Sequence, residues 1–589
     1  DNTQSGMTAL PVSDNTQSRM TALPARLRSA LKGEAAEFSD FEKTQIIIAL
    51  DKVKILDPAC GSGAFPMGVL HKILVLMRTI DPEAKKWFEL KIKNVDASIR
   101  RVLQEKFQDD NWDYIRKYGI LQDSIYGVDI QPIAVEISKL RSFLTLAIEE
   151  KIDDSKPNRG IVPLPNLEFK FVAANTLIAL PDYKQELSLF SFDQEMDELR
   201  EIRSEYFRSA SAEKKLLEAK FQSAQNNIAR KLLNSGAGKL TAEAITKVAN
   251  WNPFAHSASD FFEPEWMFGI SIGFDIVIGN PPYVQLQKDG GTLAKQFEKS
   301  GFETFARTGD IYSLFYEKGW QVLKPSGFLI FITSNKWMRA GYGEKTREFF
   351  AKRTNPKLLI DFAGVKIFES ATVDTNILLY EKNDNQLNTQ TCTIGNDYKL
   401  EMNLSEYLSR NSGTSKFADG NSWTIMNGIE AQIKAKIEAK GIALKDWDIK
   451  INYGIKTGYN EAFIIDGKKK DELIAKDPKS AEIIKPILRG RDIKRYKAKF
   501  ADLWLIATFP ALKLDIDNYP AVRDYLKTFG KRLDQSGEEG CRKKTTNKWF
   551  EVQDTIAYYK EFESEKIMYP NMTKYRPFIL DSKGYYSND

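Results

Sequence analysis

Cysteine and histidine are scarce in this chain, and their scarcity limits the chemistry it can perform. Only three cysteines occur in 589 residues, and they form neither a CxxC pair nor a disulfide framework, which favours a reducing cytoplasm. The two histidines, His71 and His256, argue against a His-based metal site or a Ser-His-Asp triad. We therefore expect any enzyme built from this sequence to work without a metal and without imidazole.

Long apolar runs are also missing. Runs such as Phe328–Ile332 are far shorter than the ~20 residues that span a bilayer, and no charged start followed by an apolar stretch marks a secretion signal. We predict no membrane segment. With 42% hydrophobic and 28% charged residues, the composition is typical of a soluble globular protein, and the length allows about three domains.

Positive charge gathers near the C-terminus. The formal net charge is +5, and residues 481–589 carry an excess of that size, so the rest of the chain balances. A basic region on a neutral body favours a polyanionic partner, although solvated surface charge explains most single lysines.

The N-terminus contains a direct repeat, Asp1–Pro11 and Asp14–Pro24, which is too short for a repeat fold. We interpret residues 1–50 as an N-terminal segment that is partly a cloning remnant. The end at Asp589 carries no clear ending signal, so we expect a longer parent protein.

Residues 51–383 alternate between short apolar runs and amphipathic helices. Strands are expected at Lys54–Asp57, Ser124–Asp129, Glu168–Ala173, Phe274–Gly279, Phe328–Thr333, Leu358–Ala363 and Val373–Tyr380. This alternation predicts an α/β fold with a mostly parallel seven-stranded sheet covered on both faces. Two polar stretches, about 82–118 and 184–260, predict helical insertions beside the sheet, with a dimerising coiled coil as the lesser alternative.

The composition changes after this region. Residues 384–428 are rich in Asn, Ser, Thr and Gly, which predicts a linker. Residues 429–589 interleave aromatic residues with Lys and Arg, and we expect a second, α+β domain there.

A glycine-rich turn follows the first expected strand. The strand ends at Asp57, and the chain passes Gly61 and Gly63 before a helix. Such glycines let a ligand approach the backbone, and the helix start offers free N–H groups, but many α/β proteins use a similar turn only to redirect the chain. The spacing is not G-x-G-x-x-G, which disfavours a nicotinamide dinucleotide. Asp129, at the tip of the second strand, is placed to bind ribose hydroxyls or, alternatively, to cap the helix that begins near Pro132.

The most specific motif is Asn280-Pro281-Pro282-Tyr283, directly after the apolar strand Phe274–Gly279. The prolines fix φ and lack N–H donors, so carbonyls stay free to accept, and the Asn side chain adds a further carbonyl. This arrangement suits a planar substrate with an amino group, whose two N–H bonds Asn280 and a proline carbonyl accept while Tyr283 stacks on the ring. A rigid loop without such a function is the alternative.

At these residues the sequence resembles the amino-methyltransferases that carry an N/D-P-P-Y/F/W motif. The fuller resemblance is to the adenine-specific enzymes of type IIG (type IIS) restriction–modification systems and to the Taq-type adenine methyltransferase. It is strong over residues 53–383 and fainter to the end. The resemblance implies a Rossmann-like methyltransferase fold with a C-terminal target-recognition domain, S-adenosylmethionine (SAM) as cofactor, double-stranded DNA as partner and a bacterial cytoplasm as setting.

The resemblance also implies roles for individual residues. The positions that match cofactor-binding residues are Asp57, Gly61, Gly63, Asp129, Ile130 and Asn175, and many relatives have Asp at the last of these. Asn280 to Tyr283 match the catalytic tetrapeptide. Tyr380, twelve residues after Phe368, matches a second aromatic that stacks on the target base, or is a core tyrosine.

The implied reaction needs a base outside the duplex. An adenine within the helix cannot meet the sulfonium methyl, so it must be flipped, and stacking on Tyr283 replaces ~1–3 kcal/mol of lost base stacking. Methyl transfer to N6 is then direct, without a covalent intermediate. The resemblance also disfavours cytosine-C5 chemistry, which needs a cysteine nucleophile directly after a proline, whereas Cys60 follows Ala59.

The C-terminal region resembles the target-recognition domains of the same family. The candidate DNA-binding residues there are Arg489, Arg491, Lys494 and Arg495, with 542–548 as a second candidate loop, although phosphate or solvent contact is the plainer role of each cation. Fewer than about 55 residues precede the first motif, too few for a nuclease domain, so a nuclease would lie in a missing part of the polypeptide. RNA or protein-glutamine methylation and a silent DNA-binding module remain as alternatives.

Overall fold

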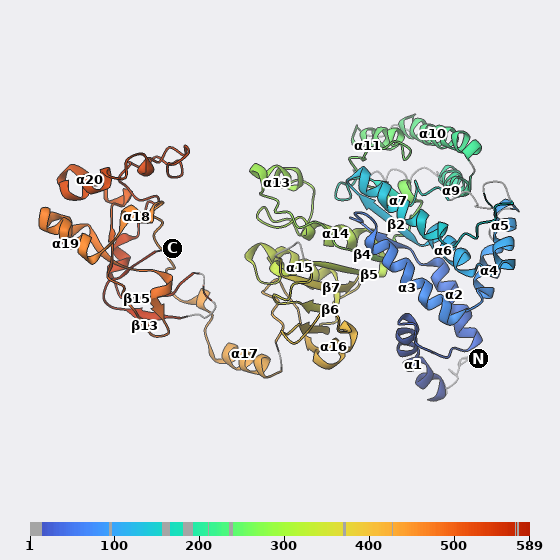
Figure 1. The fold of residues 1–589 in the computed structure, drawn as a ribbon, viewed down its shortest axis with the longest axis horizontal. Coiled ribbons are helices and arrows are strands. Elements are labelled where there is room, and N and C mark those ends of the chain that lie inside the picture. The colour runs from blue at the N-terminus through green and yellow to red at the C-terminus, as the bar shows by residue number, and fades with distance from the viewer. Residues whose placement is uncertain are drawn as a thin grey trace, which may run out of the picture. The chain divides into compact units, whose positions relative to one another are not determined.

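The computed structural model describes residues 14–93, 97–155, 159, 165–180, 193–209, 211–234, 239–368, 373–426, 428–571, 573 and 577–588. The chain forms two compact units, Asp1–Ile437 and Glu438–Asp589, which Figure 1 shows as ribbons. The first copy of the N-terminal repeat, Asp1–Pro11, lies outside the described residues, whereas the second copy begins helix α1 (Asp14–Leu31). No helix within the described ranges is long and apolar enough to cross a membrane.

A nine-stranded sheet organises the first unit, in the order β3-β2-β1-β4-β5-β7-β6-β8-β9. Strands β3 to β5 in this order run parallel, while β7 is antiparallel to both β5 and β6. The mostly parallel α/β fold is therefore confirmed. The strands are β1 (Ile55–Asp57), β2 (Ile125–Asp129), β3 (Phe171–Ala173), β4 (Phe274–Gly279), β5 (Leu323–Ser334), β6 (Asn355–Asp361), β7 (Thr375–Glu381), β8 (Thr389–Thr393) and β9 (Gly413–Ser415).

The segment 384–428, expected to be a linker, instead extends the sheet. β8 pairs with β6, β9 pairs with β8, and α16 (Leu404–Asn411) lies between these strands in the chain. Two threonines of β8 are buried with their hydroxyls hydrogen-bonded: Thr389 donates to the Pro356 carbonyl at 2.9 Å, and the Thr391 hydroxyl lies 3.0 Å from that of Ser415. The boundary between the units falls later, within α17 (Gly428–Lys440).

Helices cover both faces of the sheet. On one face, α2 (Asp40–Lys52), α3 (Ala64–Ile80) and α7 (Pro132–Ala147) contribute to an apolar cluster that includes Ile55. On the other face, α14 (Tyr312–Val322) and α15 (Glu344–Arg353) contribute to a second cluster that includes Leu56. Neighbouring strand residues thus serve opposite faces, as a period of two requires.

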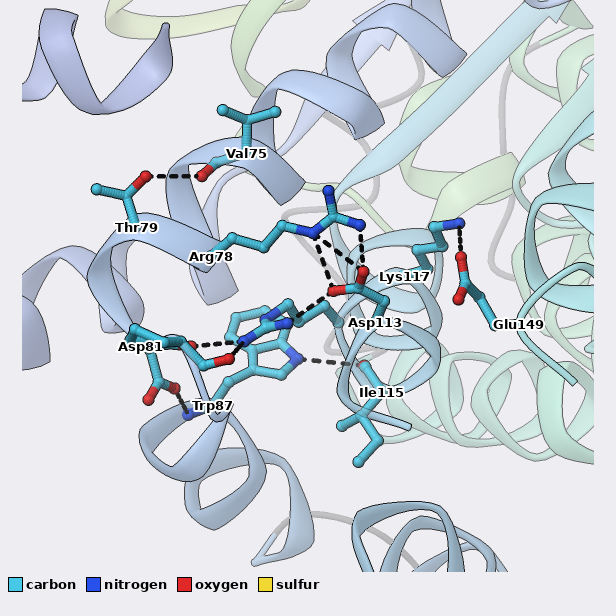
Figure 2. Close-up of polar contacts among 11 residues, drawn as sticks. Val75, Arg78, Thr79, Asp81, Trp87, Asp113, Ile115, Lys117 and Glu149 are labelled. Atoms are coloured by element: carbon cyan, nitrogen blue, oxygen red, sulfur yellow. Dashed lines mark hydrogen bonds and ion pairs between the residues drawn. The ribbon is translucent and has the colours of Figure 1, made fainter. Parts of the chain in front are cut away.

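An ion pair joins the first helical insertion to α3, and further hydrogen bonds hold the insertion together (Figure 2). It consists of α4 (Lys85–Ile92), α5 (Ala97–Gln108) and α6 (Trp112–Asp123). The indole of Trp87 donates to the Ile115 carbonyl at 3.2 Å. Asp113 accepts from Arg78 of α3 and, at 2.6 Å, from the buried Arg116.

The second helical insertion contributes to the core beside the sheet. It contains α9 (Asp193–Arg208), α10 (Ser211–Asn234) and α11 (Lys239–Asn250). Leu199, Phe221 and Ile245 from these helices join the cluster that includes Leu56. Residues 184–192, 210 and 235–238 of the expected insertion lie outside the described residues.

The second unit has its own sheet, of order β10-β14-β11-β17, and its own apolar core around Phe463, Ile487 and Leu505. Its mixed character matches the α+β expectation. The helices are α18 (Asn460–Phe463), α19 (Gly467–Lys476) and α20 (Pro520–Lys527), and the strands are β10 (Ile464–Asp466), β11 (Ile484–Leu488), β12 (Ile493–Lys494), β13 (Lys497–Ala498), β14 (Leu503–Ile506), β15 (Lys566–Met568), β16 (Ile579–Asp581) and β17 (Tyr586–Ser587).

Candidate active site

The carboxyl ends of β1, β2 and β4 meet at one edge of the first sheet. Asp57 ends β1, Asp129 ends β2, and Asn280 directly follows β4. The strand order reverses beside β1, with β2 and β3 on one side and β4 and β5 on the other. Ligands of open α/β sheets bind at the carboxyl ends of strands at such a reversal. We call this region the catalytic edge.

The ends of β1 and β4 approach each other closely at the catalytic edge. A Cβ atom on Gly279 would lie 2.7 Å from Oδ1 of Asp57, which is closer than real Cβ atoms come to an oxygen. The side chain of Asp57 therefore occupies the space beside residue 279. The Asn280–Tyr283 tetrapeptide consequently begins next to the first motif, although the two are far apart in sequence.

The glycine-rich turn is tied to β2 and to α7. Gly61 and Gly63 adopt left-handed backbone conformations, with φ of 52° and 83°. The N–H of Gly61 donates to Oδ2 of Asp129 at 2.9 Å, and the hydroxyl of Ser138 donates to the Gly61 carbonyl at 3.0 Å. Helix α3 starts directly after Gly63 without a side-chain cap, so its first N–H groups are available to a ligand.

Asp57 is a buried acid with one unsatisfied oxygen. Its exposed fraction is 2%, and Oδ1 accepts the N–H of Ala59 at 3.1 Å. Oδ2 has no hydrogen-bond partner among the described residues. Burial raises the pKa of Asp57 to about 8, and the charge of Asp129 adds to this effect. An orphaned buried oxygen of this kind calls for a donor or a cation that is not supplied by the surrounding side chains.

The other expected cofactor residues flank this acid. Asp129 is half-buried, and its Oδ1 accepts the N–H of Gln131 at 2.9 Å at the start of α7, so it serves both the glycine turn and the helix start. Ile130 is 55% exposed. Asn175 is half-buried and accepts the Leu177 N–H at 3.2 Å. The structure thus brings the expected residues from three strand ends to the catalytic edge.

The tetrapeptide holds its own asparagine by an internal hydrogen bond. The hydroxyl of Tyr283 donates to Oδ1 of Asn280 at 2.7 Å and also reaches the Ile332 carbonyl at 3.2 Å. Burial raises the pKa of Tyr283, which keeps the hydroxyl protonated as a donor. The amide of Asn280 is therefore oriented with its oxygen toward the tyrosine. Pro281 is buried and Pro282 is exposed.

Two tyrosines outside any recognised motif support Tyr283. Tyr312 is fully buried and meets the Tyr283 ring edge to face, with the centroids 6.0 Å apart. Its hydroxyl lies 3.3 Å from that of Tyr342, which donates to Asp310 at 2.9 Å. These tyrosine contacts join the segment after β4 to the segment after β5. The sequence offered no signal for these residues, because single tyrosines have no diagnostic spacing.

A comparison with protein families finds a match in the middle of the chain. Residues 123–368 match the family model described as Eco57I restriction-modification methylase, and this range contains Asp129, Asn175 and the tetrapeptide. This part of the chain is therefore similar to Eco57I-type restriction-modification methylases.

Proteins that are similar to this chain are named as type II methyltransferases. The chain is 27% identical over 396 residues to a putative type II restriction enzyme and methyltransferase of Methanocaldococcus jannaschii, RM.MjaORFECS2P, covering 56% of this chain and 30% of that protein. It is 22% identical over 336 residues to the type II methyltransferase M.BstVI of Geobacillus stearothermophilus, covering 54% and 58%. The chain thus spans from about a third to somewhat over half of these relatives. The solved type IIL restriction-modification enzyme MmeI in complex with DNA matches with a TM-score of 0.38 and 11% identity, covering 98% of this chain and 61% of that one.

The structure contradicts the expectation that Tyr380 stacks on the target base. Tyr380 is fully buried, and its hydroxyl donates to the Tyr316 carbonyl at 2.6 Å. Because β7 is antiparallel to β5, it begins at the catalytic edge and runs away from it, so Tyr380 lies in the core opposite Leu329. Phe368, in the segment that follows β6, is half-buried.

The four cations expected to contact DNA differ in their surroundings. Arg489 makes a bidentate ion pair with Asp492, with both contacts at 2.9 Å. It therefore stabilises its own turn. Arg491, Lys494 and Arg495 are exposed, the last two on the β12–β13 hairpin.

Arg542 was expected in a DNA-facing loop, and the structure shows a different role. Its exposed fraction is 4%. The guanidinium donates to four backbone carbonyls at 2.7–3.0 Å, those of Thr457, Leu533, Trp549 and Glu551. The charge therefore organises loops within the second unit. A charge count could not reveal these internal acceptors.

Proposed function

We propose that this chain transfers the methyl group of SAM to the exocyclic N6 amine of an adenine flipped out of double-stranded DNA, within a restriction–modification system of the type IIG/IIS kind. The observation that carries the proposal is the position of the Asn280–Tyr283 tetrapeptide, which begins beside Asp57 where the strand order reverses. The names of the relatives, which are type II methyltransferases, support the same class of reaction.

The residues at the catalytic edge fit SAM, which supplies a reactive methyl group on a sulfonium. The orphaned Oδ2 of Asp57 would accept from a cationic part of the cofactor, because a buried carboxylate is stabilised by an opposite charge. The Gly61–Gly63 turn and the start of α3 would receive the cofactor's carboxylate. Asp129 would bind the ribose hydroxyls, and Ile130 and Asn175 would contact the adenine ring.

The tetrapeptide would hold the target amine. Oδ1 of Asn280 has a second lone pair besides the one that Tyr283 uses, and this lone pair and the Pro281 carbonyl would each accept one N–H of the amine. With both hydrogens held, the nitrogen lone pair faces the methyl group, and the two acceptors stabilise the positive charge that develops on the nitrogen. Tyr283 would stack on the flipped base.

We further propose Phe368, in place of Tyr380, as a second residue that contacts the flipped base. Phe368 lies on the loop between β6 and β7, which leaves and re-enters the sheet at the catalytic edge. In the second unit, the exposed Arg491, Lys494 and Arg495 would contact the DNA as part of a target-recognition domain.

The test is methyl transfer by the purified chain. Plasmid DNA is incubated with SAM labelled in its methyl group, and the nucleosides are separated and identified by mass spectrometry. We expect N6-methyladenine from the wild type and at least ~100-fold less from Asn280→Ala, because that variant loses an acceptor aimed at developing charge. SAM binding, measured by calorimetry, should be unchanged in this variant.

The matched control is Asn411→Ala, which removes an exposed asparagine on α16 and should leave the rate unchanged. A methylated cytosine, a wild-type rate in Asn280→Ala, or transfer only to RNA or to protein glutamine would each overturn the proposal.

A further inference from the structure

The loop between β5 and α15 carries positive charge to the catalytic edge. This loop, residues 335–343, contains Lys336 and Arg339 and no acidic residue. It starts where β5 ends, and β5 is the direct parallel neighbour of β4, which leads into Asn280. The cations therefore lie at the same edge as the tetrapeptide. We call this segment the β5–α15 loop.

Arg339 is held on one side by a buried carboxylate. Its Nη2 donates to Oδ2 of Asp361 at 3.0 Å, and the exposed fractions of the two side chains are 60% and 0%. Asp361 ends β6, and its Oδ1 accepts Nδ2 of Asn335 at 2.8 Å and the N–H of Ala363 at 3.0 Å. Among the described residues, no further acceptor is recorded for Nε or Nη1 of Arg339.

The pairing orients Arg339 more than it stabilises the fold. An ion pair with one exposed member contributes on the order of 1 kcal/mol or less, and Asp361 already accepts two other hydrogen bonds. A guanidinium has five donors in a rigid plane. With one nitrogen fixed by Asp361, the rest of the plane faces solvent in a set direction, which is how arginine is presented to a phosphate.

The β5–α15 loop is mechanically connected to the tetrapeptide. Tyr342 lies in the loop, and its hydroxyl bonds to Asp310 and lies 3.3 Å from that of Tyr312. Tyr312 in turn contacts the ring of Tyr283. The loop that presents Arg339 is thus positioned by the same residues that support the stacking tyrosine.

We propose that Arg339, oriented by Asp361, donates a two-pronged hydrogen bond to a DNA phosphate close to the flipped nucleotide. The inference rests on the proposed function. It adds a DNA contact in the first unit to the contacts proposed for the second unit. β4 and β6 are three strand positions apart, which is roughly 14 Å at ~4.8 Å per strand. Phosphates of one strand follow at ~3.4 Å along the helix axis, so the contact falls within about four nucleotides of the target.

The experiment compares the wild type with Arg339→Ala, Arg339→Lys and the control Lys357→Ala. Lys357 is a half-buried cation near the start of β6, at the end of the strand opposite to Asp361, and it pairs with Glu381. Binding of a 40-base-pair mixed-sequence duplex is measured between about 50 and 300 mM NaCl, a range in which phosphate contacts weaken strongly. Steady-state methyl transfer to plasmid DNA and the affinity for SAM are measured in parallel.

We expect Arg339→Ala to reduce the slope of log K against log[NaCl] by about 0.9, the value for one lost phosphate contact. Its Kd for the duplex and its KM for DNA should rise roughly tenfold or more, as for a lost charged hydrogen bond, with unchanged SAM affinity. Arg339→Lys should keep the slope but bind several-fold more weakly, because lysine lacks the planar fork. Lys357→Ala should match the wild type.

A purely structural role for Arg339 would lower the unfolding temperature of Arg339→Ala while leaving the salt slope at the wild-type value. That result overturns the inference alone, because the wild type would still bind and methylate DNA. A wild type that neither binds nor methylates DNA overturns the proposed function, and this inference with it.

Discussion

The carboxyl group of Asp57 is tuned by its burial between the ends of β1 and β4. Its pKa is raised from 3.8 to about 8. Between these values the folded chain keeps a proton that the unfolded chain has released, so the free energy of unfolding falls as pH rises through this window. A bound cation would reverse this balance by favouring the ionised form.

The variant Asp57→Asn tests both the raised pKa of this acid and its pairing with the charge of the cofactor. Without SAM, the variant should be more stable than the wild type, by a margin that grows from about pH 4 to about pH 8 and is then constant, because an amide does not titrate. It should bind SAM at least ~10-fold more weakly, since it lacks the charge that pairs with the cofactor. Thermal unfolding at several pH values and calorimetric titration with SAM measure both. An unchanged pH dependence would refute the assigned pKa.

Single residues were predictable where the signal is local. Asp57 and Asp129 end short apolar strands and Asn280 directly follows one, and parallel strands bring these ends together. Tyr380 was misassigned because its spacing from Phe368 does not reveal the direction of β7. Arg542 was misassigned because its acceptors are carbonyls of loops elsewhere in the second unit, and a sequence does not show such long-range contacts.

The pairing of β1 and β4 depends on the absence of a side chain at one position. Gly279→Ala would place a methyl group 2.7 Å from Oδ1 of Asp57. Either strand must then shift, and the buried acid leaves little room. We expect a loss of about 1–3 kcal/mol in unfolding free energy and at least a ~10-fold loss in methyl transfer, because misplacing the tetrapeptide misaligns the amine.

Gly68→Ala is the matched control for this element. Gly68 lies within α3, and a Cβ there meets nothing within 4 Å. Alanine should be neutral or stabilise α3 by up to about 1 kcal/mol. Denaturant unfolding and the initial methylation rate measure both variants. Equal effects of the two substitutions would show that the space beside Asp57 is not limiting.

Elements were predictable from periodicity when one face was strongly apolar. All seven expected strands of 51–383 correspond to β1–β7, of which β4 has the expected ends and the other six are shifted at one or both ends. β8 and β9 were taken for a linker because their residues are mostly threonine, glutamine, glycine and serine. Threonine favours strands through its branched Cβ, but next to Asn and Ser it resembles a loop. Only the pairing with β6 shows that this segment is a strand and not a loop.

At the scale of the whole molecule, the apolar cores of the two units are separate clusters. We therefore expect two unfolding transitions in differential scanning calorimetry. SAM should raise the temperature of only the transition of residues 1–437, by mass action on the folded state. Arg542→Ala should lower only the other, by several degrees, because four buried carbonyls lose their donor.

The control for the second unit is Lys543→Ala, which changes an exposed neighbour and should leave both transitions in place. A single cooperative transition, shifted as one by SAM and by Arg542→Ala, would contradict this division. The existence of two units was predictable from the change of composition, but the boundary was not, because a polar edge strand and a linker have similar residues.

The bond from Tyr283 to Asn280 also has a statistical consequence. A primary amide that rotates freely exposes its nitrogen as often as its oxygen, and half of its population would then repel an incoming amine. Here a neighbouring phenol selects one rotamer in advance. The entropy of choosing that rotamer is lost once, when the chain folds, so each arriving base meets an acceptor that is already turned the right way.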